Sequence, residues 1–308
     1  MDDTRAFLQE IGLPGREAAD LPDSGRRFPD GARYRVEIPS TEGPAALRAV
    51  VAAAREYRVR VHRVSQGSGI QLLTDDDIRE MAAIGRGEGI EVSLFVGPRA
   101  IFDTGAQAFH PAGKSLGWQH RGVDQLVYAV EDIRRACDLG IRGVLVADIG
   151  LLHVVTRMKR AGKLPANLVV KTSLLLGAPN PATVWLLEEL GAGTVNVTAD
   201  LSTAQIASIR QAVSLPLDVY IEVPDGFGGF VRYYELPDLL RAAAPLYVKL
   251  GLRNAPEIYP SGTHLEGTVG ALSRERVRRA RIALDFIARY APWATMSEVG
   301  APDLGIPE

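Results

Sequence analysis

The sequence contains little cysteine, few aromatic residues and almost no net charge. Its 308 residues include one cysteine, Cys137, and only 6% are Phe, Trp or Tyr. One cysteine excludes an internal disulfide, a four-cysteine zinc site and an iron–sulfur cluster held by this chain alone. The 35 basic and 37 acidic residues give a net charge of −2, so the chain lacks the positive charge typical of nucleic-acid binders. We therefore expect neither an iron–sulfur cofactor nor a nucleic-acid partner.

Long apolar runs are absent as well. No segment approaches the roughly 18 uninterrupted apolar residues that a membrane span requires. The acidic start, MDDTRAFLQEIGLPG, has no long apolar core of the kind found in secretory signals. A hydrophobic content of 46%, with charges of both signs, is typical of a globular chain. We expect a soluble, cytoplasmic protein with no membrane partner, and a homo-oligomer remains open.

Short β-rich runs alternate eight times with amphipathic helical stretches. The predicted strands occupy residues 34–38, 59–64, 90–96, 143–148, 168–173, 194–199, 217–223 and 246–251. Apolar residues at most strand positions, with a helix after each strand, indicate a parallel sheet covered by helices on both faces. Eight units of about 32 residues are close to the length of a (β/α)₈ barrel. The pattern predicts an α/β fold with a single TIM barrel. A doubly wound sheet is the weaker alternative, because no GxGxxG follows the first strand.

The chain divides into three parts on this interpretation. Residues 32–290 form the barrel, residues 1–31 form a short N-terminal extension over one barrel end, and residues 291–308 form a C-terminal tail. Because βα loops emerge at one end of a barrel, we expect the long segments 97–121 and 251–267 to lie on the same face.

Several helix boundaries are legible in the sequence. Thr74 precedes an acidic first turn, Asn180 precedes an N1 proline, and Ser202 with Gln205 forms a capping box. We expect the last helix to begin at Ser273 and to end near Tyr290. Its basic run, SRERVRRARIAL, is typical of a solvated or salt-bridged outer face.

Charged side chains recur near the carboxyl ends of the predicted strands, where the chemistry of a (β/α)₈ barrel takes place. The candidate catalytic residues are Glu37, Asp148, Lys171, Glu222 and Lys249. A lysine among apolar groups, or beside another cation, can lose its proton near neutral pH and form an imine. The three carboxylates could divide acid and base roles, or hold a divalent cation through oxygen. The competing interpretation is a salt-bridge network that plugs the barrel, in which Glu222 or Asp148 pairs with a lysine across it.

Further polar residues at the same strand ends, or in the loops that follow, are candidates for binding a substrate. They are Arg63, Ser65, Ser173, Asn196, Arg253, Asn254 and His264. Arg253 and Asn254 directly follow the last predicted strand. A guanidinium offers two parallel donors to a carboxylate, so this pair suits an anionic ligand.

From the fourth to the seventh strand the chain resembles peptidase family U-32, the collagenase-like group. The matching features are VADIGLL at 146–152, Ser173 in KTS, Asn180, LLEELGAGTV at 186–195, DLSTAQIASI at 200–209 and Glu222 in DVYIEV. The resemblance implies a TIM barrel and a hydrolase that acts on a small peptide-like or carboxylate-bearing substrate at the barrel mouth. Members of that family typically follow the acid of the seventh strand with a His-Gly pair and several cysteines. Here Glu222 is followed by VPDGFGGF, so the cysteine-based chemistry of its relatives cannot be carried over.

Two other functions remain open from the residues themselves. One is a carbon–carbon lyase or aldolase in which Lys171 or Lys249 forms an imine with the substrate. The other is a non-catalytic barrel that serves as a partner subunit. Complete internal pairing of the five candidate catalytic residues, with no pocket left at the rim, would favour the subunit.

Overall fold

Eight parallel strands close into a barrel in which each strand pairs with its neighbours in the chain and β8 pairs with β1. The computed structural model describes residues 2–18, 20–97 and 117–308. The strands are β1 (Tyr34–Pro39), β2 (Arg63–Ser65), β3 (Glu91–Val96), β4 (Gly143–Val146), β5 (Val169–Thr172), β6 (Thr194–Asn196), β7 (Leu217–Glu222) and β8 (Leu246–Leu250). The predicted (β/α)₈ TIM barrel is confirmed.

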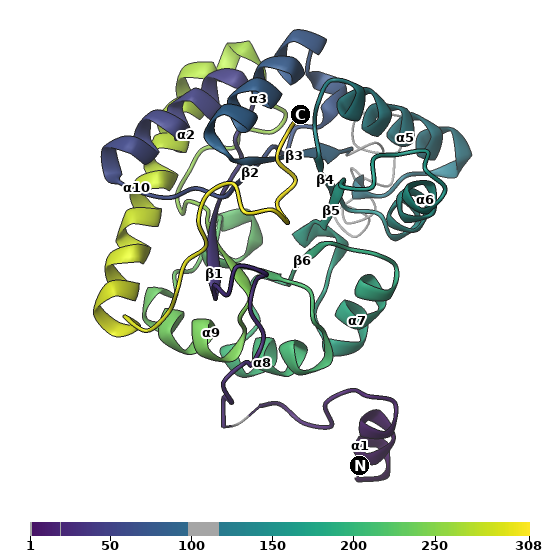
Figure 1. Cartoon of the computed structure of the whole chain (residues 1–308), viewed down its shortest axis with the longest axis vertical. Helices are drawn as coiled ribbons and strands as arrows, with labels where there is room; N and C mark the ends of the chain where they lie inside the picture. Colours follow the sequence, from purple (N-terminus) through teal and green to yellow (C-terminus); the bar gives the residue numbers. More distant parts are fainter. Residues whose placement is uncertain (1, 19, 98–116) are drawn as a thin grey trace.

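Helices surround the barrel as an outer ring, and the short helix α1 lies away from it (Figure 1). The described helices are α1 (Asp2–Glu10), α2 (Pro44–Tyr57), α3 (Asp75–Glu88), α5 (Gly122–Asp138), α6 (Ile149–Arg160), α7 (Pro181–Glu189), α8 (Thr203–Ala212), α9 (Leu236–Ala242) and α10 (Glu266–Tyr290). Strand residues that point outward, such as Val36, Val64 and Val144, pack against this ring in one continuous apolar core. No helix within the described ranges is both long and apolar enough to cross a membrane.

The helix caps follow the sequence closely, with one exception. Thr74 forms a capping box at the start of α3, Asn180 caps α7, and Ser202 forms a capping box at α8. The expected start of the last helix at Ser273 is wrong, because α10 begins at Glu266. The two additional turns contain Gly267 and Gly270, which are poor helix formers. Burial of Val269 against Ala46 and Ile258 compensates for that low propensity.

The strand register arranges the inward-facing side chains in layers of four, each layer drawn from alternate strands. The central layer contains Glu37, Ser93, Lys171 and Asp218. The layer below it, toward the N-terminal end of the barrel, contains Arg63, Gly143, Thr194 and Tyr247. The layer above contains Ser65, Leu145, Asn196 and Lys249, and Phe95, Ser173 and Tyr220 follow nearest the mouth. Barrel interiors are usually filled with Val, Ile and Leu, so these polar layers are unusual.

The N-terminal end of the barrel is closed by both ends of the chain. Phe28 packs edge-on against Tyr247 and, with Ala301 and Leu304, forms a small apolar cluster beneath the barrel. Arg35 Nη2 contacts Asp303 Oδ1 at 2.6 Å, so a buried cation from β1 is paired with the tail. The extension and the tail therefore seal one end of the barrel.

The segment 251–267 lies at the opposite end, as predicted. The backbone N–H of Arg253 donates to Glu222 Oε1 at 3.0 Å, at the carboxyl end of β7. The N–H of Ser261 donates to Ser68 Oγ at 2.8 Å, in the loop after β2. Most of the other long segment, residues 98–116, lies outside the described residues.

Candidate active site

The centre of the barrel holds a network of buried charges around Glu37. Arg63 donates to Glu37 Oε2 from Nε at 2.8 Å and from Nη2 at 2.5 Å. On the other carboxylate oxygen, Oε1 accepts from Ser65 Oγ at 2.8 Å and from Lys171 Nζ. Lys249 Nζ lies 3.3 Å from the same oxygen. We name Glu37, Arg63, Glu91, Lys171, Asp218 and Lys249 the charged core.

Two further carboxylates complete the charged core. Asp218 Oδ1 accepts from Arg63 Nη2 at 2.5 Å, and its Oδ2 lies 3.3 Å from Lys171 Nζ. Glu91 Oε1 lies 3.7 Å from Arg63 Nη1. The charged core thus contains three carboxylates and three cations, and each of its side chains is at most 2% exposed. Removing a charge from such a network leaves its partner buried and unpaired.

The electrostatics of the charged core perturb its lysine and its acids. Burial, together with the nearby charge of Arg63, lowers the pKa of Lys171 from 10.5 to about 8. Burial would raise the pKa of Glu37, but Arg63, Lys171 and Lys249 hold it well below its usual value. Burial raises the pKa of Glu91, although Arg63 opposes the shift. Lys171 is therefore held in an environment where its amine can lose a proton near neutral pH.

Lys249 occupies the layer nearer the mouth. The Nζ of Lys249 lies 4.3 Å from the centre of the Tyr220 ring. With the Asn196 amide oriented so that its nitrogen donates to the Asp218 carbonyl, the Asn196 oxygen accepts from Lys249 Nζ at 3.0 Å. Tyr220 in turn covers Lys249 on the side of the mouth. The amines of Lys171 and Lys249 thus share one carboxylate oxygen of Glu37, and Lys249 is the one closer to an incoming ligand.

Asp148 and Glu222 do not join the charged core, although the sequence placed them beside the lysines. Asp148 caps α6, with Oδ1 accepting from Leu151 N at 2.7 Å and Oδ2 from His120 N at 3.0 Å. These hydrogen bonds and the nearby His120 ring lower the pKa of Asp148 against the opposing effect of its burial. Glu222 accepts from Tyr233 Oη at 3.0 Å and from the backbone of Arg253. The carboxylates that clamp the lysines are instead Glu37 and Asp218.

The predicted substrate-binding residues separate into two groups. Arg63, Ser65 and Asn196 belong to the barrel interior, where Arg63 is a core cation covered by the ring of Tyr247 at 3.6 Å. Ser173 lies in the top layer, but its hydroxyl accepts from Leu175 N at 3.2 Å.

The remaining predicted binding residues lie in the loop after β8. Arg253 is about half exposed and pairs with Asp225 at 3.0 Å, and the Asn254 backbone contacts the same carboxylate. His264 is exposed in a short 3₁₀ turn. Arg253 therefore already has an anionic partner within the chain.

Sequence reasoning missed Glu91, Asp218 and Tyr220. All three alternate with apolar residues inside predicted strands, in IEVSLFV and LDVYIEV. A polar residue at every second position of an otherwise apolar strand points to one face, and here that face is the barrel interior. This signal runs along the whole strand, whereas the predicted site residues were chosen from the strand ends.

The predicted cation site of Glu37, Asp148 and Glu222 does not form, because the three carboxylates lie in different surroundings. Among the described residues, no group of three or more His, Cys, Asp or Glu side chains is arranged to hold a metal ion.

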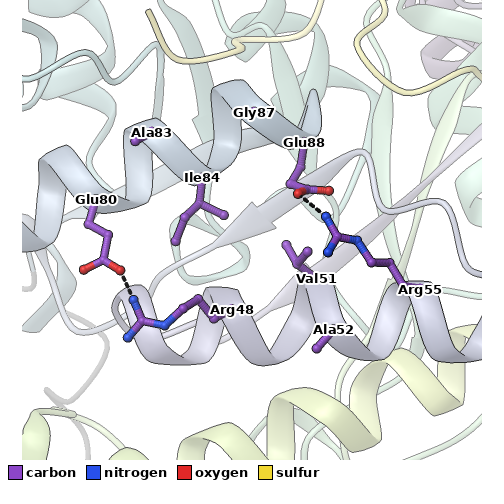
Figure 2. A pocket seen from close by; sticks show the side chains of 9 residues that line it. All are labelled: Arg48, Val51, Ala52, Arg55, Glu80, Ala83, Ile84, Gly87 and Glu88. Atoms are coloured by element: carbon purple, nitrogen blue, oxygen red, sulfur yellow. Dashed lines mark hydrogen bonds and ion pairs between the residues drawn. The ribbon is translucent and has the colours of Figure 1, made fainter.

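A groove on the outer surface has a different character. It encloses about 470 Å³ between α2 and α3, with Val51 and Ile84 on its apolar walls (Figure 2). Its charged groups are paired across it, Arg48 with Glu80 and Arg55 with Glu88. The groove lies between two helices of the outer ring, and none of the residues of the charged core lines it.

Comparison with known proteins finds similarity to one protein family and to several solved structures. A search of curated protein sequences finds no match. Among solved structures, a U32 peptidase is 16% identical, covers 74% of this chain and 98% of its own, and has a TM-score of 0.44. A chain of the tryptophan synthase α2β2 complex from Pyrococcus furiosus is 13% identical, with 84% and 99% coverage and a TM-score of 0.46. The 4-hydroxy-tetrahydrodipicolinate synthase from Methylacidiphilum fumariolicum SolV is 12% identical, with 84% and 79% coverage and a TM-score of 0.43.

The model of peptidase family U32 matches residues 122–223. This stretch runs from α5 to the end of β7 and includes Lys171, Asn196 and Asp218. The resemblance predicted from the sequence between the fourth and seventh strands is therefore confirmed: residues 122–223 of this TIM barrel are similar to peptidase family U32.

Proposed function

We propose that this chain is an enzyme that forms an imine between Lys249 and a small carbonyl substrate at the C-terminal mouth of the barrel. The observation that carries the proposal is the pair of lysine amines on one oxygen, Glu37 Oε1. Two ammonium groups that share one carboxylate oxygen repel each other, which favours loss of a proton from one of them. A neutral amine is the nucleophile that imine formation requires.

The layers divide the roles between the two lysines. Lys171 is fully buried in the central layer, between Glu37 and Asp218. Lys249 lies one layer nearer the mouth, below Tyr220. Lys249 is therefore the amine that adds to the substrate, and Lys171, whose pKa is lowered by burial, is the base that takes its proton and later returns it.

The reaction class follows from that chemistry. Once Lys171 has taken a proton from it, the amine of Lys249 adds to the substrate carbonyl carbon. Lys171 returns that proton to the carbonyl oxygen, which leaves as water to give the protonated imine. Lys171 then takes the proton of a hydroxyl on the β-carbon, the bond between the α- and β-carbons breaks, its electron pair passes to the imine nitrogen to give an enamine, and the β-carbon fragment leaves as a second carbonyl compound. Reprotonation of the enamine and hydrolysis of the imine return the free lysine. A carbon–carbon lyase or aldolase of small carbonyl compounds is the class we propose.

Borohydride reduction in the presence of short 2-keto acids, aldehydes and ketones tests this proposal. We expect the intact mass of the wild-type chain to increase by the reduced adduct, and peptide mapping to place the adduct on Lys249. The variant Lys249→Arg keeps the positive charge but cannot form the imine, so it should give no adduct. Lys163→Arg, at an exposed lysine, is the matched control and should still be labelled. Absence of any adduct at Lys249 would reject the lyase.

Hydrolysis of a peptide-like substrate is the second candidate, because the matched family is a peptidase family. In that case Lys171, with its lowered pKa, would act as the base that takes a proton from water. Release of new amino groups from a peptide library, with no adduct on borohydride treatment, would favour hydrolysis over the lyase.

The non-catalytic subunit is supported by a different observation. Glu37, Asp148, Lys171, Glu222 and Lys249 each have partners within the chain, which is the criterion that favours a structural role. Neither an adduct nor hydrolysis across both substrate sets, with a stable fold, would favour the subunit.

A further inference from the structure

Arg276 is a buried cation whose pairing is incomplete. The sequence placed it on a solvated face of the last helix, but its exposure is only 4%. Its neighbours in the basic run behave as expected: Arg274 pairs with Glu56 at 2.5 Å, and Arg278 pairs with Glu275 at 2.8 Å. Arg276 alone among these three arginines turns toward the barrel.

The hydrogen bonds of Arg276 leave most of its donors unused. A guanidinium has five N–H donors. Within the described residues, the one hydrogen bond that Arg276 makes is from Nη1 to the Ser40 carbonyl, at 3.4 Å. Its Nε is buried and has no hydrogen-bond partner in the part of the chain that the structure describes. A buried cation without a hydrogen-bonded anion is costly, so this arrangement suits a group that receives an anion from outside.

Glu42, the acid whose charge acts on this arginine, already has hydrogen-bond partners. Glu42 accepts from Gly67 N at 2.6 Å and from Ser68 N at 3.0 Å, and it lies beyond ion-pair distance from Arg276. Glu42 and Tyr259 act on Arg276 only through space, and burial lowers the pKa of its guanidinium in spite of them. The carboxylate of Glu42 thus holds the loop after β2 and does not neutralise Arg276.

The position of Arg276 is beside the barrel mouth. Ser40 directly follows β1, and its hydroxyl accepts from Tyr259 in the segment that caps the mouth. Tyr220, which covers Lys249, is close enough to act on the charge of Arg276. A ligand bound above Lys249 would therefore have the guanidinium at its side.

We propose that Arg276 binds a carboxylate group of the substrate at the barrel mouth and so makes that substrate a small carboxylate-bearing carbonyl compound. This inference rests on the proposed function, because it assigns the substrate class of the same site. The role predicted for Arg253 passes to Arg276, since Arg253 is exposed and already paired with Asp225. Arg276 is a binding residue in this account, and Lys249 remains the nucleophile.

Binding of two small ketones to the wild type, Arg276→Met and Arg274→Met tests the inference. The probes are pyruvate and acetone, which carry the same methyl ketone and differ in the carboxylate, and binding is measured by calorimetry without borohydride. We expect Arg276→Met to weaken pyruvate binding by about ten- to a hundredfold, since a hydrogen bond to a charged group is lost. Acetone binding should not change. Arg274→Met, two residues away and exposed, should bind pyruvate as the wild type does.

Thermal melting of the ligand-free variants separates binding from a structural role. If Arg276 receives the anion, Arg276→Met should melt no lower than the wild type, because a poorly paired buried charge is removed. If Arg276 only supports the Ser40 loop, Arg276→Met should melt lower than the wild type and should bind pyruvate and acetone equally weakly, which would overturn the inference. Unchanged pyruvate binding by Arg276→Met would overturn it too. The two proposals can also fail separately. If Arg276→Met loses pyruvate binding but the wild type gives no adduct at Lys249, the imine chemistry is rejected and the binding role of Arg276 stands.

Discussion

At the scale of single residues, the charged core distinguishes two lysines that the sequence treats alike. Both lie in apolar strands, in VVKTS and YVKLG. Lys171 contacts both Glu37 and Asp218, whereas Lys249 contacts Glu37 and an amide. Their loss should therefore have different consequences for stability.

We expect Lys171→Met to lower the free energy of unfolding by about 3–5 kcal/mol, because Glu37 and Asp218 lose a shared buried cation. Lys249→Met should cost less, since Glu37 keeps Arg63 and Lys171. Denaturant unfolding of the two variants and the wild type measures the difference. Equal costs would show that the two lysines support the charged core equally.

The partners of these lysines could not be predicted from the sequence, although their place in the barrel could. Each strand's polar positions are legible, and they indicate an inward face. Which carboxylate reaches which amine depends on the tilt of the strands and on the register between β5 and β7, which lie two strands apart. The sequence contains no local signal for that register, so the prediction that Asp148 or Glu222 pairs with a lysine is wrong: Glu37 contacts both lysines, and Asp218 contacts Lys171.

At the scale of the helices and strands, the local rules predicted most boundaries. Caps and strand–helix alternation depend on neighbours a few residues apart, and those were read correctly at α3, α7 and α8. The start of α10 depended on packing of Val269 against a distant helix and loop, and it was missed. Asp148 shows the same difference. Its role as a helix cap depends on Leu151, three residues away in the chain, whereas its predicted catalytic role depends on long-range packing of the strands.

We expect Asp148→Ala to lower the free energy of unfolding by about 1 kcal/mol, because Leu151 N and His120 N lose their acceptor. Asp148→Asn keeps a cap acceptor and should recover most of that loss. Thermal melting of both variants, with activity measured in parallel, checks the assignment. If Asp148→Asn melts like the wild type but has no activity, Asp148 is a catalytic residue after all.

At the scale of the whole molecule, a buried histidine connects the barrel to the C-terminal tail. His62 Nδ1 accepts from Val36 N in β1 at 3.0 Å, and His62 Nε2 contacts the Ser297 carbonyl in the tail at 2.8 Å. That arrangement requires the neutral ring, in which Nε2 carries the proton. Burial lowers the pKa of His62 from 6.5 to about 4.

This shift predicts a loss of stability in mild acid. Between pH 6.5 and pH 4 the unfolded chain binds a proton at His62 that the folded chain does not, so stability falls as the pH falls through this range. Protonation of His62 in the unfolded chain lowers the free energy of unfolding by an amount on the order of 3 kcal/mol over this pH range. Melting temperatures from pH 7 to pH 4 should fall less steeply for His62→Gln than for the wild type. Parallel curves would show that His62 is not the group responsible.

The seal beneath the barrel determines how molecules reach the charged core. Phe28, Tyr247 and the tail cover the lower end, on the side away from Lys249 and Tyr220. On the proposed function, substrate and product would therefore both pass through the mouth, and a product would have to leave before the next substrate could enter. Protons exchanged with Lys171 would follow the same route. We therefore expect substrate entry and product release at the mouth, beside Tyr220 and Arg276, to limit the rate of turnover.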